Sequence, residues 1–363
     1  MRRTPALIVG GGLAGAAAAI GLARAGLPHL LVERQVETGD ALCGGFLSWR
    51  SLQSLAMLGV AADTINPAPI TQVRVFAGGR MIAADLPQPG RSVSRRRLDR
   101  LLLDRAEAAG ARIERGITVR AIDRDGPDRI ARTSDNATID ADALFLASGK
   151  RDVRGLARPA DARGADPTLG LRMRLPASPA LARALEATVE LHLFAGGYAG
   201  LALQEDGSAN LCLAVHVSRF RAAASPLALL RALGDENPAL GERMARRDAA
   251  IEAIANVPYG WRERCGEAGL FRLGDQAGVI PSLAGEGMGI ALASGIAAAD
   301  AYRRAGAGGG MRWQQDFAAT LRRPIAVAGA VRHVAESRLA PTALLVAHPW
   351  LVNLIARATR IAH

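Results

Sequence analysis

The residues near the N-terminus whose types and spacing suggest chemistry are a cluster of glycines followed by an acid. Residues 10–15 read Gly-Gly-Gly-Leu-Ala-Gly, which fits the pattern G-x-G-x-x-G, and Glu33 follows 18 residues after Gly15. Gly10 permits a tight turn, Gly12 lets backbone N–H groups approach a pyrophosphate, and Gly15 lets a helix pack closely on a strand. Glu33 is placed to accept a hydrogen bond from a ribose hydroxyl. The predicted contact residues of this segment are Gly10, Gly12, Leu13, Ala14, Gly15, Glu33 and Arg34.

These residues act together only if a strand, a helix and a second strand position them. Residues 6–9 form an apolar run that suits a strand buried on both faces. Residues 16–25 are strongly helix-forming and end before Gly26, and residues 29–32 form a second apolar run that ends at Glu33. The alternative is a Gly-rich turn with a purely structural role. The order of strand, helix, strand and acid favours a dinucleotide-binding unit.

A second group of residues with the same kind of chemistry lies near the other end of the chain. The apolar run 270–273 leads into Gly274-Asp275, and the glycine-rich segment 285–289 opens a long Ala-rich helix. A carboxylate at a strand end suits the hydroxyls of a polyol, and a Gly-rich helix start suits an electron-rich oxygen or nitrogen atom. A ribityl chain and the N1–C2 carbonyl edge of an isoalloxazine need that pair. The predicted cofactor is therefore FAD.

Two further segments complete a family resemblance. Residues 94–99 read Ser-Arg-Arg-Arg-Leu-Asp, and residues 143–149 form an apolar strand that ends in Ala-Ser-Gly. Together with the two glycine-rich segments, they resemble the FAD proteins of the p-hydroxybenzoate hydroxylase and geranylgeranyl reductase superfamily. The resemblance implies that Arg95 lies beside the flavin or the pyrophosphate. The further FAD contacts that it implies are Cys43, Gly44, Arg95, Ala147, Gly149, Gly274, Asp275, Pro281, Gly285, Gly287 and Met288.

The fold expected from these features is α/β, with a Rossmann-like FAD-binding domain, a discontinuous, mostly antiparallel β-sheet substrate domain and a C-terminal helix. Alternating residues predict strands over 71–76, 188–194 and 210–217, and residues 226–255 suit helices. The expected tail helix either packs on the FAD domain or contacts a membrane surface weakly. The expected boundaries are 1–70, 95–155 and 259–335 for the FAD-binding domain, 71–94 and 156–258 for the substrate domain, and 336–363 for the tail.

Three residues are candidates for catalysis. Cys43 begins a Cys-Gly-Gly segment that resembles that of geranylgeranyl reductases, which implies a thiol near the flavin that assists reduction or protonation. The alternative is a small buried residue in a tight loop. Glu286 lies between two glycines and either lines the active site or complements the dipole of the helix that follows. His192 alternates with Glu190 on one predicted strand and either points into the pocket or has a structural role.

The expected reaction is that of an FAD-dependent oxidoreductase on a hydrophobic or aromatic small molecule of polyketide or isoprenoid type. Monooxygenation is favoured because the scaffold often hosts hydroxylases, which is an analogy of fold. Reduction of a carbon–carbon double bond, indicated by Cys43, is the alternative, and a non-catalytic flavin-binding partner protein is a third. Residues 190–195 keep only the Phe of the Y-x-W-x-F-P strand typical of the reductases, and Ser148-Gly149 replaces the Asp-Gly of the hydroxylases. NADPH or NADH is the expected electron donor, with an external donor protein as the alternative.

Composition excludes several other functions. The formal net charge is +11, but 44 of the 45 basic residues are Arg, scattered among acids, and only 14 residues are aromatic, so we expect no nucleic-acid partner. Three cysteines lack the spacing of a disulfide framework or a metal site, so we expect no metal. The start Met1-Arg2-Arg3 before an apolar run imitates a secretory signal, but the glycines and Glu33 that follow argue against one. A cytoplasmic location is expected.

Overall fold

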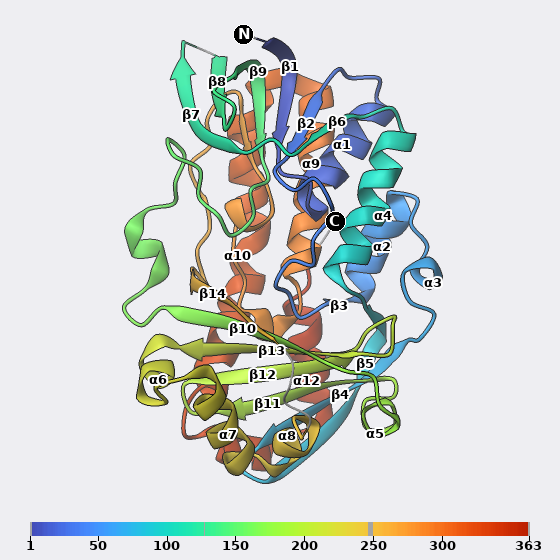
Figure 1. Cartoon of the computed structure of the whole chain (residues 1–363), viewed down its shortest axis with the longest axis vertical. Coiled ribbons are helices and arrows are strands. Elements are labelled where there is room, and N and C mark those ends of the chain that lie inside the picture. The colour runs from blue at the N-terminus through green and yellow to red at the C-terminus, as the bar shows by residue number, and fades with distance from the viewer. Residues whose placement is uncertain (1, 127, 246–249, 362–363) are drawn as a thin grey trace.

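The computed structural model describes residues 2–126, 128–245 and 250–361, and it contains two β-sheets that lie one above the other with long helices beside them (Figure 1). The first sheet follows the order β6-β2-β1-β9-β8-β7, with β15 paired to β9. Its strands are β1 (Arg2–Val9), β2 (Leu30–Glu33), β6 (Arg112–Arg115), β7 (Val119–Asp125), β8 (Asp128–Thr133), β9 (Thr138–Leu146) and β15 (Leu270–Arg272). Strands β6, β2, β1, β9 and β15 run parallel, so their carboxyl ends meet at one edge. Ligands of open α/β sheets bind at that edge.

The helices that cover this sheet pack closely because their contact residues are small. Ala16 to Ala19 of α1 are fully buried, and a Cβ on Gly295 of α9 would lie 2.3 Å from the carbonyl oxygen of Ala14. Strand β1, helix α1 and strand β2 follow each other as the sequence predicts. The helices of this half are α1 (Leu13–Arg24), α2 (Trp49–Met57), α3 (Ala62–Ile65), α4 (Arg95–Ala108), α9 (Gly287–Ala305) and α10 (Gly310–Ala335).

The second sheet follows the order β14-β10-β13-β12-β11-β4-β5-β3. Its neighbouring strands are antiparallel except β11 and β4, which are parallel, so the predicted mostly antiparallel sheet is confirmed. The strands are β3 (Phe46–Leu47), β4 (Ile70–Ala77), β5 (Arg80–Ser92), β10 (Thr168–Leu175), β11 (Thr188–Phe194), β12 (Gly197–Leu203), β13 (Ala209–His216) and β14 (Ile251–Val257). One face of this sheet points toward the first sheet, and helices cover the other face (Figure 1).

The covering helices are α5 (Pro179–Ala184), α6 (Val217–Ala222), α7 (Pro226–Glu236) and α8 (Pro238–Arg243). Leu229, Leu230 and Leu233 of α7 are fully buried in an apolar core that they share with the strands. The prediction of helix over 226–255 is wrong at its end, because residues 251–257 form β14 at the edge of the sheet. Pairing with β10 overrides the local helix preference there. Residues 246–249 lie outside the described part.

The C-terminal segment forms two short helices after α10, which contains Pro324. These are α11 (Ala340–Val346) and α12 (Pro349–Ala358), separated at Ala347 and His348 because a residue before proline disfavours helical geometry. Helix α12 packs along β5, and the side chain of Asn353 donates a hydrogen bond of 2.7 Å to the carbonyl of Asp85. Among the described helices none has the length and apolar content needed to span a membrane. Short 3₁₀ turns are η1 (Ala160–Arg163), η2 (Gly274–Gln276), η3 (Ser282–Ala284) and η4 (Gly306–Gly309).

Candidate active site

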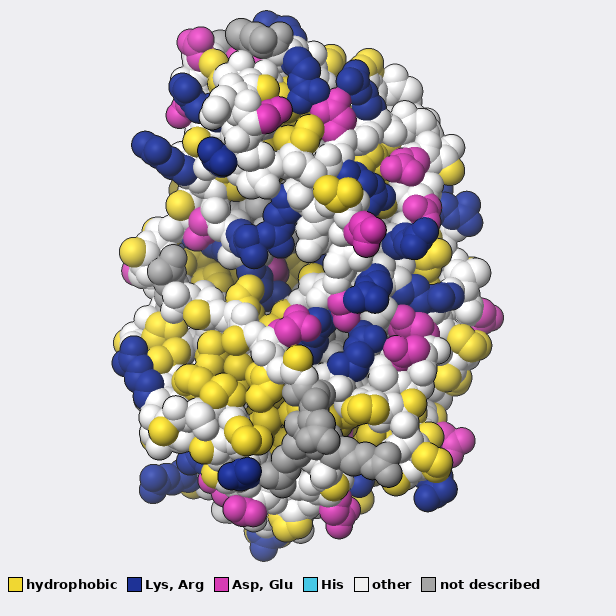
Figure 2. All heavy atoms as spheres, viewed as in Figure 1, with side chains coloured by type: hydrophobic (Ala, Val, Ile, Leu, Met, Phe, Trp, Pro, Cys, Tyr) yellow, Lys and Arg dark blue, Asp and Glu magenta, His cyan; other side chains and the backbone are white. Residues whose placement is uncertain are grey.

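A cavity of about 680 Å³ lies between the two sheets. Its upper wall comes from the start of α1, from residues that follow β9 and β15, and from the loop that precedes α9. Its lower wall is the inner face of the second sheet, and α11 and α12 close one side. Figure 2 shows that the molecular surface is hollowed at mid-height, between the two halves, with basic side chains beside the hollow. The cavity therefore joins the predicted cofactor residues to the sheet predicted to form the substrate pocket.

The start of α1 has the geometry of an anion site. The N-cap residue Gly12 offers no side-chain cap, and the first turn contains no acid, so the backbone N–H groups there have no side-chain acceptor. Gly10 has a φ of +108°, and a Cβ on Gly15 would lie 1.9 Å from the carbonyl oxygen of Gly10. Only glycine fits either position. Gly12, Leu13 and Ala14 line the cavity, whereas Gly10 and Gly15 shape the turn from behind.

Glu33 lies at the carboxyl end of β2, beside this turn. Its carboxylate accepts hydrogen bonds from the backbone N–H of Gly11 at 2.6 Å and from that of Gln35 at 2.9 Å. These two bonds fix the carboxylate at the end of the first two parallel strands, while each oxygen keeps further lone pairs for a hydroxyl donor. The neighbouring Arg34 is exposed.

Arg95 reaches the same region from the start of α4 and lines the cavity. Its guanidinium makes two hydrogen bonds with Asp99, of 2.9 Å from Nε and 2.8 Å from Nη2. Burial works to lower the pKa of Arg95, but Asp99 and then Cys43 outweigh it, so the pKa is raised. Burial raises the pKa of Asp99 despite the Arg95 charge. Arg95 is therefore a fixed cation at the cavity wall.

The ends of β9 and β15 contribute a second charged pair. Ala147, Gly149, Gly274 and Asp275 line the cavity, as does Lys150, whose Nζ lies 3.7 Å from Asp275 Oδ2. The Asp275 charge is the main cause that raises the pKa of Lys150. Sequence reasoning did not assign Lys150 to this site. The one available signal was that it is the single lysine of the chain.

The loop before α9 presents its backbone to the cavity. Gly285, at a φ of +62°, Gly287 and Met288 line the cavity, and α9 has neither a side-chain cap nor an acid in its first turn. Pro281 lies between the lining residues Ile280 and Ser282. A second helix N-terminus thus offers free N–H groups to the cavity, as the sequence predicts.

Glu286 does not line the cavity, so that interpretation is wrong. Its side chain is fully buried behind the loop and accepts a hydrogen bond of 2.9 Å from Ser48 Oγ. It also forms an ion pair with Arg360, and the guanidinium of Arg360 lies over the ring of Trp49. Burial raises the pKa of Glu286 despite the Arg360 charge. Its role is to tie the C-terminal segment to the loop before α9.

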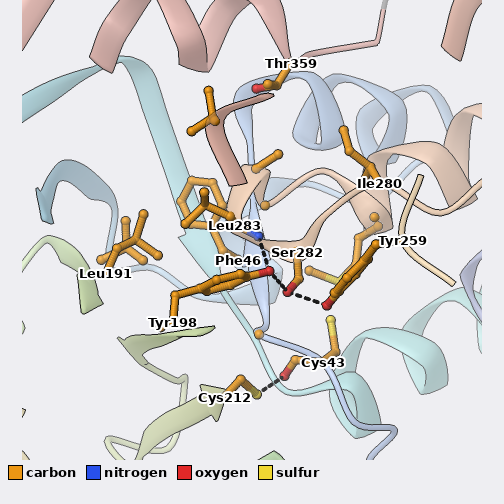
Figure 3. Close-up of a pocket in the computed structure, with 18 of the residues that line it drawn as sticks. Cys43, Phe46, Leu191, Tyr198, Cys212, Tyr259, Ile280, Ser282, Leu283 and Thr359 are labelled. Carbon is orange, nitrogen blue, oxygen red and sulfur yellow. Dashed lines mark hydrogen bonds between the residues drawn. The ribbon is translucent and has the colours of Figure 1, made fainter. Parts of the chain in front are cut away.

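Cys43 lines the cavity below Tyr259 (Figure 3). Its carbonyl oxygen accepts hydrogen bonds from Asn210 Nδ2 at 2.9 Å and from the thiol of Cys212 at 3.1 Å. Burial raises the pKa of Cys212 to about 12, so that residue remains a thiol and acts as a donor. The pairing of Cys43 with Cys212, 169 residues later, is invisible in the sequence. Gly44 also lines the cavity.

His192 points away from the cavity, contrary to one of the two interpretations of the sequence. Val189, Leu191 and Leu193 of β11 line the cavity, so Glu190 and His192 face the helices on the other side. The imidazole is fully buried, stacks on Phe76 with ring centroids 4.5 Å apart, and lies 3.2 Å from Glu190 Oε2. Its role is structural. Val189, Leu191 and Leu193 make one parity of β11 apolar, but the parity of Glu190 and His192 is buried as well, so the alternation alone does not show which face points into the cavity.

Three hydroxyl groups meet inside the cavity, and no motif in the sequence predicts them. Tyr198 Oη lies 2.6 Å from Ser282 Oγ, and Tyr259 Oη donates to the same oxygen at 2.7 Å (Figure 3). The backbone N–H of Leu283 donates to Tyr198 Oη at 2.9 Å. Burial raises the pKa of Tyr198 well above its ordinary value, so the phenol stays neutral. We call Tyr198, Ser282 and Tyr259 the hydroxyl cluster.

Comparison with known proteins identifies part of the chain. Residues 3–168 match the model of the FAD binding domain family. A probable electron transfer flavoprotein-quinone oxidoreductase, YdiS, of Escherichia coli is 30% identical over 161 residues, which cover 41% of this chain and 37% of that protein. The menaquinone reductase of Mycobacterium tuberculosis is 30% identical over 156 residues, which cover 41% of this chain and 38% of that protein. The matched region thus spans less than two fifths of each of these relatives.

Solved structures share the fold over nearly the whole chain. A flavoprotein/dehydrogenase from Cytophaga hutchinsonii superposes with a TM-score of 0.81 at 16% identity, covering 98% of this chain and 93% of that one. A geranylgeranyl bacteriochlorophyll reductase-like protein from Thermoplasma acidophilum gives 0.74 at 19% identity, with coverages of 100% and 94%. PqsL of Pseudomonas aeruginosa, a probable FAD-dependent monooxygenase, gives 0.73 at 18%, with coverages of 95% and 100%. The predicted fold is confirmed, and the match of residues 3–168 to the FAD binding domain family agrees with the resemblance.

The described residues fit FAD. The N-terminus of α1 and Arg95 offer N–H donors and a cation for the pyrophosphate, and Glu33 offers acceptors for the ribose of the adenosine. Asp275 would offer acceptors to the ribityl hydroxyls, and the uncapped N-terminus of α9 would offer N–H donors to the isoalloxazine ring. Both helix starts lack side-chain caps, which leaves their donors available to a ligand.

Proposed function

We propose that the protein is an FAD-dependent oxidoreductase that acts on a hydrophobic small molecule, because residues 3–168 match the model of the FAD binding domain family. The observation that carries the proposal is the continuity of the cavity. One cavity is lined by glycines of the two helix starts, Arg95 and Asp275 on one side and by the apolar inner face of the second sheet on the other. When bound, FAD supplies two-electron chemistry and, in its reduced form, reacts with dioxygen.

The class of substrate follows from the lower wall of the cavity. Val73, Val75, Leu191 and Ile254 contribute apolar side chains, and α11 and α12 add more. The hydroxyl cluster provides donors and acceptors in these surroundings. Such a site favours a molecule with an extended apolar body and a hydroxyl or carbonyl oxygen, as in a phenol or a quinone of polyketide or isoprenoid type.

We propose monooxygenation as the reaction. In this reaction one oxygen atom of O₂ enters the substrate, the other becomes water, and NADPH or NADH provides the two electrons. Apolar walls support this chemistry because they exclude water, which would otherwise divert the reaction. The hydroxyl cluster would orient the oxygen of a phenolic substrate and take part in moving its proton. Arg95 would hold the cofactor, without a role in the chemical step.

Reduction of a carbon–carbon double bond is the second candidate, and two observations favour it. Cys43 lines the cavity, where a thiol can deliver a proton, and a curated relative of the FAD-binding part is named menaquinone reductase. In this reaction two electrons and two protons add across the bond, and no dioxygen is consumed. An external donor protein could replace the pyridine nucleotide as the source of electrons.

The test is a visible spectrum of the purified protein, followed by addition of NADPH or NADH under nitrogen and then in air. We expect flavin absorption, bleaching by one of the nucleotides, and oxygen consumption that matches product formation from a phenol bearing an apolar tail. Product formed from an isoprenoid quinone under nitrogen would instead indicate the reductase. A protein that binds no FAD after reconstitution would overturn the proposal, and bound FAD that no donor reduces would indicate a non-catalytic carrier.

A further inference from the structure

We infer that α11 and α12 bind the surface of an anionic lipid bilayer. The inference concerns a surface outside the active site and does not depend on which reaction the protein catalyses. It rests on five large apolar residues that are exposed within one short stretch. They are Leu339 (68% exposed), Leu345 (61%), Val346 (77%), Trp350 (64%) and Leu354 (52%). We call them the C-terminal apolar surface.

Helix α12 is apolar on two opposite faces. Leu351, Val352 and Ile355 point inward and line the cavity. Trp350 and Leu354, one helical turn apart, point outward together with Arg357. Large apolar side chains on a helix are normally buried against a neighbouring element, yet Trp350 and Leu354 are exposed. The inner face has its partner in β5 and α10, so the outer face lacks one within the described structure.

The charges around this surface identify the partner. Residues 337–361 contain no Asp or Glu, and Arg338 and Arg357 are exposed. Arg80, at the β4–β5 turn, adds a third exposed cation, and this turn touches α11 because a Cβ on Gly78 would lie 2.8 Å from Pro341. Asp85 is an exposed acid on the adjoining strand β5, so the cations outnumber it. Glu336 is buried in an ion pair with Arg332.

Apolar side chains flanked by arginines suit an anionic membrane better than a protein. Trp and Leu enter the boundary between head groups and acyl chains, and Arg side chains remain at the level of the phosphates. Each basic residue near such a surface adds to the electrostatic attraction, which salt weakens. The same helices form a wall of the cavity, and Val334 both lines the cavity and is 46% exposed. The cavity wall and the membrane-binding face are therefore continuous.

The experiment is sedimentation of the full-length, FAD-loaded protein with lipid vesicles. Vesicles of phosphatidylcholine with one third phosphatidylglycerol are compared with vesicles of phosphatidylcholine alone. We expect the protein to bind the anionic vesicles, and we expect the double variant Trp350→Ser/Leu354→Ser to bind at least about tenfold more weakly, because it loses two apolar anchors. Val36→Ser is the matched control, since Val36 is 72% exposed on the other half of the molecule. The FAD spectrum and the thermal midpoint show whether each variant is folded.

Two further readouts make the result decisive. The fluorescence of Trp350 should shift to shorter wavelength with anionic vesicles, and Trp350→Phe should lose the shift while it keeps most of the binding. Arg338→Glu/Arg357→Glu should weaken binding as added salt does. Absence of binding to anionic vesicles would overturn the inference. So would a wild-type dimer in solution that the double variant converts to a monomer, because the surface would then contact a second copy of the chain.

Discussion

At the scale of single residues, Glu33 is the clearest test of the cofactor site. Its carboxylate accepts two backbone N–H groups and has lone pairs left for a ribose hydroxyl. We expect Glu33→Ala to weaken FAD retention by about 1–3 kcal/mol, the usual cost of leaving one partner of a hydrogen bond unsatisfied. Isothermal titration of FAD into the apoprotein measures this change. Glu37→Ala, at an exposed position nearby, is the control, and equal FAD affinity in the two variants would contradict the role of Glu33.

The thiol of Cys43 lies in the cavity wall, where a proton donor is useful to either proposed reaction. We expect Cys43→Ser to retain FAD but to lower kcat by tenfold or more. General acid–base catalysis usually contributes a factor of about 10²–10⁴, so a tenfold loss is a conservative expectation. Steady-state kinetics with FAD occupancy matched to the wild type measures the effect. Cys265→Ser serves as control because Cys265 is exposed. Full activity of Cys43→Ser would assign Cys43 to packing alone.

The hydroxyl cluster makes a separate prediction about the substrate. Tyr198→Phe removes the acceptor of the Leu283 N–H and one partner of Ser282, which we expect to cost about 1–2 kcal/mol of folding stability. If the cluster holds a substrate oxygen, KM should also rise for a phenolic substrate but not for its analogue without the oxygen. Comparison of KM for the two compounds measures this selectivity. Tyr302→Phe, a tyrosine outside the cavity, should leave both values unchanged.

Part of this site can be predicted from the sequence, and the hydroxyl cluster cannot, for a physical reason. Glycines at a strand–helix junction and acids at strand ends act through local geometry, so spacing alone predicts them. Tyr198, Tyr259 and Ser282 come from β12, from the segment after β14 and from the loop before α9, and only tertiary packing brings their hydroxyls together. No spacing within one segment encodes that meeting.

At the scale of elements, the outer face of β11 carries the buried carboxylate of Glu190, which makes the stability of the fold depend on pH. Burial acts to raise the pKa of Glu190, but hydrogen bonds from His192 and Arg243 outweigh it and hold the pKa below its ordinary value of 4.5. A lowered carboxyl pKa stabilises the fold above the ordinary pKa, and this stabilisation is lost as pH falls through the lower, folded-state pKa.

We therefore expect urea unfolding to show a loss of stability below about pH 4.5 that depends on Glu190. Glu190→Gln should lower the free energy of unfolding by about 3 kcal/mol or more near neutral pH, because Arg243 then loses the negative charge with which it pairs. The difference between wild type and variant should shrink as the pH falls. Glu242→Gln, on the exposed surface of α8, is the control, and a constant difference across the pH range would contradict the prediction.

The strands of the second sheet show which sequence patterns predict secondary structure correctly and which do not. Strands β4, β11 and β13 lie within a residue or two of their predicted bounds, because each alternates and is flanked by turn residues. Residues 251–255 look helical by local preference, yet they pair with β10 to complete the sheet edge. The sequence also does not show which face of β11 points into the cavity, since helices α7 and α8 bury its outer face.

At the scale of the whole molecule, the ion pair between Glu286 and Arg360 joins the C-terminal segment to the loop before α9. Arg360→Ala leaves Glu286 buried without its cation, so we expect a loss of about 3–5 kcal/mol of stability. Chemical unfolding measures the loss. The double variant Glu286→Gln/Arg360→Ala should recover part of it, because no charge is then buried alone. A double variant as unstable as Arg360→Ala would contradict the charge-pairing explanation.

The same ion pair has a consequence for how the protein is made. Strands β1 and β9 can pair once the first half of the chain is synthesised, but β15 joins the sheet only after residue 272 is available. The loop before α9 receives Arg360 later still, only after residue 360 is available. Domains begin to fold during synthesis. The nascent protein therefore passes through a stage in which the first glycine-rich turn is formed, while the second, before α9, still lacks the ion pair between Glu286 and Arg360. Stable retention of FAD should thus require the synthesis of residue 360, long after the first turn has formed.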